Sequence, residues 1–295
     1  MQCPPVETEM RSASFLKHAI IVLLLAMAVT GGQARAQQTR MVEIPEDTGN
    51  LVHFSYATLL GTGIYRLDDR TVTIFRIPLG WSIREAVPDK FGIDFKLPVA
   101  IGFYDFDVLE DLIPVGDQLS TISVAPGLEL QFLLGERWQL KPAVYTGLGY
   151  DMSNEEAAWI YGGGIAALYD IPVEYPQMNF GTAVLMSGYV PDDGESDFIT
   201  RWSMGVDSLF LTPLEVWDKK VFLGGHVIGY YYLDKVQFQT IGAAPIEITT
   251  ELEFGLFFGT RPAPKIFGIE IDRLGMGYRF SRQGDAVVFF AGFPF

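Results

Sequence analysis

Apolar and polar residues alternate with a period of two through most of the chain beyond residue 50. In segment 137–151, RWQLKPAVYTGLGYD, the even-numbered positions are mostly apolar or aromatic, and the odd-numbered positions hold Arg137, Gln139 and Lys141. Segment 91–104 repeats this pattern. Successive side chains of a β-strand point to opposite faces, so each segment predicts a strand with one apolar face. The alternation is longer than a typical strand of a soluble sandwich.

Turn residues divide the same region into segments without helical periodicity. The phase of the alternation changes within 266–281, which requires a bulge or a later strand start there. Pro98 and Pro142 fall inside predicted strands and indicate local bulges. We expect strands near 51–66, 71–85, 91–106, 117–134, 137–151, 157–170, 176–190, 197–212, 219–234, 248–260, 268–281 and 285–295.

These strands predict an all-β fold, a transmembrane antiparallel up-and-down β-barrel of about 12 strands. Trp138 and Tyr150 lie on the apolar face of one strand. At ~3.3 Å per residue and a tilt of ~40–45°, they are about 29 Å apart in height, close to the spacing of two aromatic belts. A soluble lipid-carrying sandwich or calyx is the alternative, but it would have to hide two extensive apolar faces in one core. A bilayer accommodates them more easily.

The N-terminal region predicts an export signal. The apolar run Ile20–Val29 is too short to span a membrane as a helix, and Arg11 and Lys17 precede it. Ala34-Arg35-Ala36 has the small residues that a signal peptidase requires, so we expect a signal peptide over 1–36 with cleavage before Gln37. Met10 is a better start than Met1, because acidic residues lie between them. Residues 37–50 are then a short periplasmic segment, and 51–295 form the barrel.

The last predicted strand ends on aromatic residues. Counting by twos gives an apolar face of Val287, Phe289, Ala291, Phe293 and Phe295. With the export signal and the alternating strands, this ending resembles bacterial outer-membrane β-barrel proteins. The resemblance implies a terminal Phe read by the barrel-assembly machinery, periplasmic chaperones as further partners, and both ends of the barrel chain in the periplasm. It also implies outer-membrane lipid and lipopolysaccharide as the surroundings, in a Gram-negative cell.

Composition excludes several classes of function. The only cysteine, Cys3, lies in the expected leader, so the mature chain has none. Three of the 21 basic and two of the 36 acidic residues also lie in the leader, which leaves 18 and 34 and a net charge of about −16. Such a charge argues against nucleic acid as a partner. No cluster of His, Cys or carboxylate residues has the spacing of metal ligands, so we expect no metal and no cofactor.

The predicted inward faces carry charges of both signs, which can line a narrow pore or neutralise one another. Glu251 and Glu253 should lie near Arg279 on the next barrel strand. The leading hypothesis is a small passive channel for small solutes, and the alternative is a non-conducting structural or assembly barrel. The candidate pore-lining residues are Asp94, Lys96, Glu129, Gln131, Arg137, Gln139, Lys141, Arg201, Asp207, Glu251, Glu253, Arg273 and Arg279.

An enzyme is the least favoured interpretation. His53 and Ser55 share a strand face, as in outer-membrane phospholipases and lipid-A deacylases. Those families continue with Asn where this chain has Tyr56, and their site faces the outer surface, whereas His53 is expected at the periplasmic end. His226 stands alone on its strand and indicates packing or pore lining. We therefore expect no catalytic residues.

Overall fold

The computed structural model describes residues 60–67, 70–104, 119–152, 155–192, 196–238, 246–266, 269–282 and 284–295. All of them belong to one compact unit, 49–295. The expected signal peptide, the segment 37–50, and His53 and Ser55 lie outside the described residues. Within the described part of the chain, no helix is long and apolar enough to cross a membrane.

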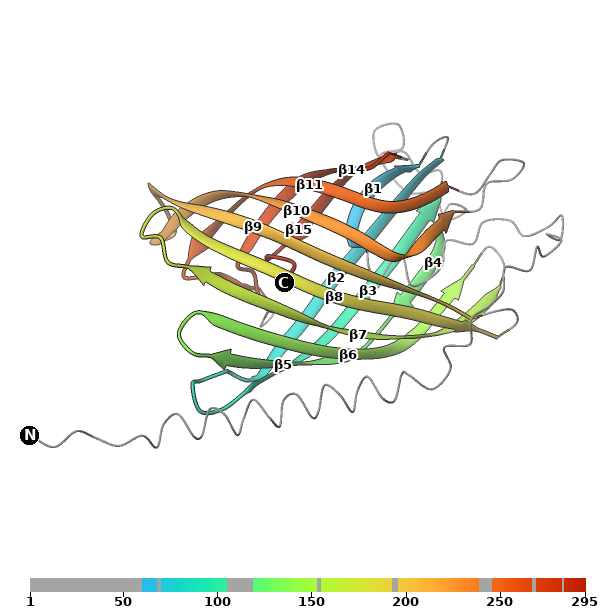
Figure 1. Ribbon diagram of the computed structural model, residues 1–295, viewed down its shortest axis with the longest axis horizontal. Helices are drawn as coiled ribbons and strands as arrows, with labels where there is room; N and C mark the ends of the chain where they lie inside the picture. The colour runs from blue at the N-terminus through green and yellow to red at the C-terminus, as the bar shows by residue number, and fades with distance from the viewer. Residues whose placement is uncertain are drawn as a thin grey trace, which may run out of the picture. The chain divides into compact units, whose positions relative to one another are not determined.

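The fold is a closed barrel of twelve antiparallel strands in up-and-down order (Figure 1). Each strand of the barrel pairs with the strands before and after it along the ring, and the last strand of the chain pairs with the first to close the ring. The strands are β1 (Thr62–Leu67), β2 (Arg70–Arg84), β3 (Gly92–Tyr104), β4 (Leu119–Val124), β5 (Gly127–Leu134), β6 (Trp138–Asp151), β7 (Glu156–Ile171), β8 (Gln177–Pro191), β9 (Asp197–Val216), β10 (Lys219–Phe238), β11 (Ile246–Arg261), β14 (Arg273–Phe280) and β15 (Gly284–Ala291), with a small hairpin of β12 (Lys265–Ile266) and β13 (Ile269–Glu270) between β11 and β14.

β4 and β5 together form one strand of the barrel. Both pair with β3, and the register continues across the break, since Val124 faces Val99 and Gly127 faces Lys96. Pro126 interrupts the ladder because it has no amide hydrogen. Its carbonyl still accepts a hydrogen bond from the Thr146 amide at 3.0 Å, so the strand keeps its course.

Prolines are accommodated without the predicted bulges. Pro98 lies opposite Pro78 in an unbroken register, and Pro142 lies opposite Ile165 in another. The prediction of bulges at Pro98 and Pro142 is therefore wrong. Beside Pro142, the β5–β6 ladder omits two consecutive pairs without shifting register, since a missing donor removes a hydrogen bond but need not displace the strand.

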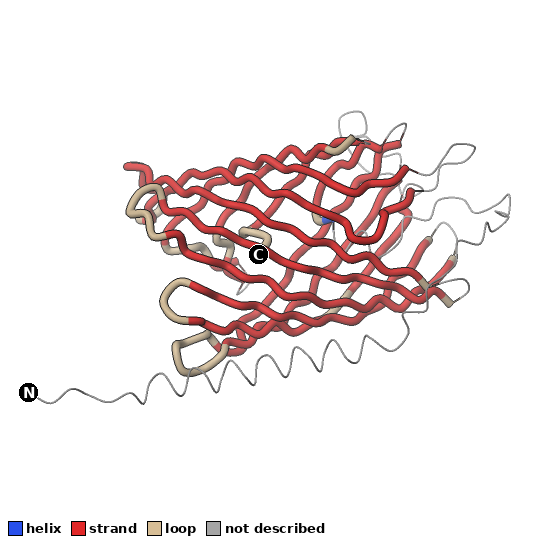
Figure 2. Tube along the Cα trace, viewed as in Figure 1, coloured by secondary structure: helices blue, strands red, loops and turns tan. Residues whose placement is uncertain are grey.

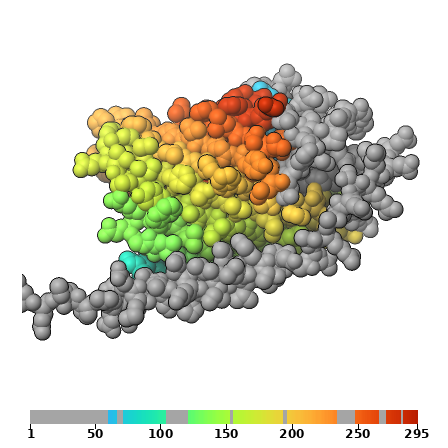
Figure 3. All heavy atoms as spheres, viewed as in Figure 1, coloured from blue at the N-terminus to red at the C-terminus, as the bar shows by residue number. Residues whose placement is uncertain are grey.

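The alternation of side chains separates an apolar exterior from a packed interior. Val144 and Leu148 are 64% and 65% exposed on β6, whereas Gly149 and Asp151 are buried. Large apolar side chains at alternate positions of the other long strands are exposed in the same way. In the space-filling view the side chains of the long strands cover the coloured face continuously (Figure 3).

The wall is uneven in height. β9 and β10 have 20 residues each, whereas β14 and β15 have eight each and β1 has six. The later start of β14, at Arg273, accounts for the change of phase within 266–281, because Ile269 belongs to the β12–β13 hairpin. We call the end of the barrel with the short turns 135–137, 172–176 and 217–218 the turn end, and the opposite end the loop end.

The chain leaves the wall after Ala291. Phe289 and Ala291 are exposed on the outer face of β15, as the alternation predicts. Gly292 has φ +98°, a conformation that favours glycine, and it turns the chain away from the strand. The expectation that Phe293 and Phe295 continue the outer face is therefore wrong. The four residues Gly292–Phe295, here called the tail, lie inside the barrel (Figure 2), and Phe295 is only 7% exposed.

Candidate functional site: the filled lumen

Glu253 is the centre of a buried polar cluster on the inner wall, which we call the central cluster. It accepts hydrogen bonds from Arg279 at 2.8 and 3.0 Å and from the Tyr230 hydroxyl at 2.9 Å, and His226 Nε2 lies 2.8 Å away. The register explains the contacts, because Glu253 and Arg279 are direct partners across β11 and β14. The ion pair expected from the sequence is thus present.

Glu251 extends this cluster towards the loop end. It accepts a hydrogen bond from the Tyr232 hydroxyl at 2.7 Å, and its carboxylate lies 3.6 Å from Arg279. Arg201 contributes from β9, with its guanidinium 4.9 Å from the ring centre of Tyr230. The Arg279 guanidinium lies 4.3 Å from the same ring. Carboxylates and cations therefore neutralise one another across β9, β10, β11 and β14.

A second ion pair joins strands that are not neighbours. Arg273 on β14 donates to Asp207 on β9, across β10 and β11. Asp207 is fully buried and also accepts hydrogen bonds from the Asn179 amide groups at 2.8 and 3.1 Å. Arg273 stacks on Phe257 at 4.5 Å. This pair spans the inner surface of the barrel rather than following one hairpin.

A third set of polar side chains lies on β3, β5 and β6, nearer the turn end, and is here called the turn-side cluster. Lys96 lies 3.1 Å from Asp94 and 3.4 Å from Glu129. Gln131 donates to Asp94 at 2.7 Å and accepts from Gln139 at 3.1 Å. The Lys96 side chain is 42% exposed, so this cluster is much more accessible than the central cluster.

The tail crosses the lumen between these clusters. The Phe293 ring centre lies 6.4 Å from that of His226, and Phe293 packs edge-on against Phe295 at 4.9 Å. Phe295 lies over Gly181 on β8, and its main-chain oxygen accepts a hydrogen bond from Lys141 Nζ on β6 at 3.0 Å. β15 and β6 stand on opposite sides of the ring, so the tail joins opposite walls.

Inward aromatic rings pack closely against glycines of the adjacent strand. Phe257 covers Gly224, Phe290 covers Gly275, and a Cβ added at either glycine would clash with the ring. His226 covers Gly255 in the same way and lies 4.6 Å from Phe290, centre to centre. The interior is therefore filled by aromatic rings and paired charges together.

Buried side chains form a continuous layer around the barrel. For every pair of neighbouring strands, at least one pair of register partners is buried on both sides. These partners are Tyr65–Val72, Ile74–Gly102, Gly102–Thr121, Thr121–Asp151, Gly149–Ala158, Ile160–Tyr189, Ser187–Ile199, Arg201–Tyr232, Ile228–Glu253, Glu253–Arg279, Arg279–Ala286 and Ala286–Tyr65. Every strand therefore contributes buried residues to the inner wall.

Most residues predicted to face the lumen do so, but Arg137 does not. It lies in the exposed turn between β5 and β6, and its carbonyl accepts a hydrogen bond from the Asp170 amide at 2.9 Å. The prediction that Arg137 lines the lumen is wrong because β6 begins one residue later, at Trp138. Tyr230, Tyr232 and Asn179 also face the lumen but were not predicted to do so. The alternation of inward and outward positions that predicted Glu253 would also have placed the two tyrosines on the inward face of their strand.

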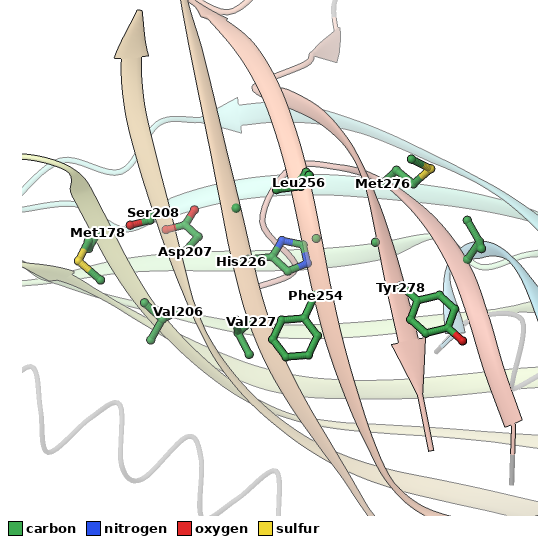
Figure 4. A pocket seen from close by; sticks show the side chains of 14 residues that line it. Met178, Val206, Asp207, Ser208, His226, Val227, Phe254, Leu256, Met276 and Tyr278 are labelled. Carbon is green, nitrogen blue, oxygen red and sulfur yellow. The ribbon is translucent and has the colours of Figure 1, made fainter. Parts of the chain in front are cut away.

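A groove of about 670 Å³ lies on the outer wall over β8 to β15 (Figure 4). Gly225, Ser208 and Val206 are among its small lining residues, and Leu256 and Met276 are among its larger ones. Leu256 is 76% exposed, so the groove belongs to the outer face and not to the lumen.

Among the described residues there is no group of three or more His, Cys, Asp or Glu side chains placed to hold a metal ion. Comparison of the sequence with models of known protein families gives no match, and comparison with curated proteins gives no significant relative. The geometry of the barrel is therefore the basis for the function proposed next.

Proposed function

We propose that this chain is a bacterial outer-membrane β-barrel whose lumen is sealed, so that it does not conduct ions or small solutes at rest. The observation that carries the proposal is the continuous layer of buried register partners around all twelve strands. A water-filled pore would leave inward side chains accessible at every level. Here Glu253, Arg279 and Asp207 are at most 4% exposed.

The exterior supports the membrane location. Only closed barrels and helices satisfy all backbone polar groups in a bilayer, and this barrel closes through the β1–β15 ladder. Trp138 and Tyr150 are both exposed at opposite ends of the outer face of β6, as aromatic belts require. The export signal over 1–36, the outer-membrane lipid environment and assembly by the barrel-assembly machinery are parts of this proposal.

The lumen charges fit a structural role better than a selectivity filter. A selectivity filter must present its charges to passing ions. The carboxylate of Glu253 is instead in hydrogen-bond contact with Arg279, His226 and Tyr230. The carboxylate of Asp207 accepts hydrogen bonds from Arg273 and Asn179. Buried charges that are paired and hydrogen-bonded in this way hold neighbouring strands in one arrangement.

A small-solute channel is the second candidate, and the turn-side cluster favours it. Asp94, Lys96 and Glu129 form a half-accessible surface of mixed charge inside the barrel. Such a surface could become part of a pathway if the buried layer opened. The hydrolase hypothesis has no support among the described residues, since His53 and Ser55 lie outside them.

Single-channel recording tests the sealed lumen. The mature protein from Gln37 should be refolded in detergent, checked for a heat-modifiable shift in gel mobility, and added to a planar bilayer. We expect no discrete current steps from folded protein beyond those of a protein-free preparation. Regular steps with a defined ion preference would overturn the sealed barrel and favour the channel.

A further inference from the structure

Twelve strands enclose more space than the side chains of the wall normally fill. An eight-stranded barrel has an interior about wide enough for its own side chains, and the interior widens with each added strand. The wall rings of Phe257 and Phe290 occupy the space left by the inner-wall glycines Gly224 and Gly275, whereas no ring of the wall is among the atoms closest to Gly181. A lumen of this size leaves room for material that does not belong to the wall.

The tail supplies such material. Phe295 is a member of the buried cluster formed by Ala183, Ile199 and Ile228 on β8, β9 and β10. Phe293 packs against the same cluster from its edge. These two rings therefore connect the end of β15 with the wall on the far side of the lumen.

The place where the tail docks is shaped for it. Phe295 packs against Gly181 on β8, and a Cβ there would stand 2.9 Å from Cβ of Phe295. On β6, Lys141 holds the Phe295 main-chain oxygen at 3.0 Å. Gly181 thus leaves space for the ring of Phe295, and Lys141 holds the backbone of the same residue by a hydrogen bond.

We propose that the tail, Gly292–Phe295, is a latch that seals the lumen, and that its release opens a polar path beside the turn-side cluster. This inference rests on the proposed sealed membrane barrel. No tail residue is a register partner in the β1–β15 or β14–β15 ladder, so moving the tail breaks the hydrogen bonds from Gly292 to Arg273 and from Lys141 to Phe295 but no strand pairing. Lys141 and the nearby Lys96, Asp94 and Glu129 would then face open space.

A disulfide between the tail and β8 tests the latch within a single polypeptide. The mature chain has no cysteine, so Gly181→Cys with Phe295→Cys introduces the only pair. The 2.9 Å separation of the two Cβ positions is slightly shorter than the ~3.5–4.5 Å of a disulfide, and a small outward shift of the tail corrects it. We expect the oxidised protein to be silent in a planar bilayer and the reduced protein to show current steps.

Two further variants separate the latch from misfolding. Lys141→Met removes the charged hydrogen-bond donor to the Phe295 main-chain oxygen, and a chain lacking 292–295 loses both aromatic rings of the tail. Both changes should raise the fraction of time spent conducting by roughly tenfold or more. Phe289→Ala is the matched control. It removes an equally large ring from β15, but that ring faces outward and is 47% exposed, so silence should persist.

The outcomes distinguish the two proposals. Steps from the wild-type protein would overturn the sealed barrel itself. A silent wild type together with silent, correctly folded variants would overturn only the latch, and would show that wall side chains seal the lumen alone. Equal conduction in the oxidised and reduced cysteine variant would also overturn the latch. Conduction confined to the reduced cysteine variant, the truncated protein and Lys141→Met is the expected result.

Discussion

At the scale of single residues, the interior depends on charges that have no access to water. Glu253 is 3% exposed, and Arg279 beside it is 4% exposed. Removing one partner of a buried ion pair leaves the other charge without compensation, and this costs more than the pair itself contributes. The stability of the barrel should therefore be sensitive to single substitutions in the central cluster.

We predict that Glu253→Ala lowers the free energy of unfolding by about 3–5 kcal/mol, because Arg279 keeps its charge without its main partner. Urea unfolding of the refolded protein, followed by tryptophan fluorescence, measures the change. Glu174→Ala is a control, since Glu174 lies in the exposed turn between β7 and β8 and its loss should change little. Equal effects of the two substitutions would contradict a structural role for the central cluster.

Two glycines on β10 provide a matched test of the packed interior. A Cβ at Gly224 would clash with the Phe257 ring and the Ser208 carbonyl, whereas a Cβ at the outward Gly229 meets nothing within 4 Å. Gly224→Ala should therefore lower the free energy of unfolding by about 1–3 kcal/mol. Gly229→Ala should leave it unchanged or raise it slightly. The same urea titration decides, and similar losses at both positions would exclude ring packing as the cause.

At the scale of elements, the β9–β10 hairpin turns on two residues with positive φ, Trp217 at 50° and Asp218 at 58°. A two-residue turn of this kind matches the twist of the strands, but it favours Asn and Gly over Trp and Asp. Trp217 is 89% exposed, so packing does not compensate for its conformation.

We predict that the double substitution Trp217→Asn and Asp218→Gly raises the free energy of unfolding by about 1 kcal/mol, because it relieves backbone strain in the turn. Gly135→Ala, at φ 71° in the β5–β6 turn, should change stability in the opposite direction by a similar amount. Denaturant midpoints of the two variants test both signs. A loss of stability in the double variant would show that Trp217 contributes contacts that outweigh the strain.

Much of the element level could be predicted from the sequence, because alternation over many residues determines both strand position and the direction of each side chain. The same parity and the antiparallel neighbours placed Glu253 beside Arg279. Three features could not be predicted in this way. The Asp207–Arg273 pair joins strands that are not neighbours. Arg137 lies in a turn, but its sequence position fits the alternation of the strand that follows, so it looks like an inward strand residue. The sequence of the tail continues the alternation of β15, although Gly292 turns the chain inward.

At the scale of the whole molecule, the described pairings are fewest at β1, which has only five register partners on β2. β1 and β15 share six register partners, whereas β7 and β8 share 14. Strands with few pairings open at lower cost than strands with many. We predict that amide hydrogens of β1 and β15 exchange with solvent several-fold faster than those of β7 and β8, as measured by mass spectrometry of the protein in detergent. Uniform exchange around the ring would contradict this.

The uneven wall has a further consequence for the lipid around it. Eight residues at ~3.3 Å each and a tilt of ~40° give β14 and β15 a height of about 20 Å, less than the ~25 Å apolar band of a typical barrel. The 16 residues of β7 reach about 40 Å by the same estimate. In the outer membrane proposed for this barrel, hydrocarbon chains beside β14 and β15 would have to shorten to match, so the bilayer would be thinned on one side only, along the seam where the first and last strands meet.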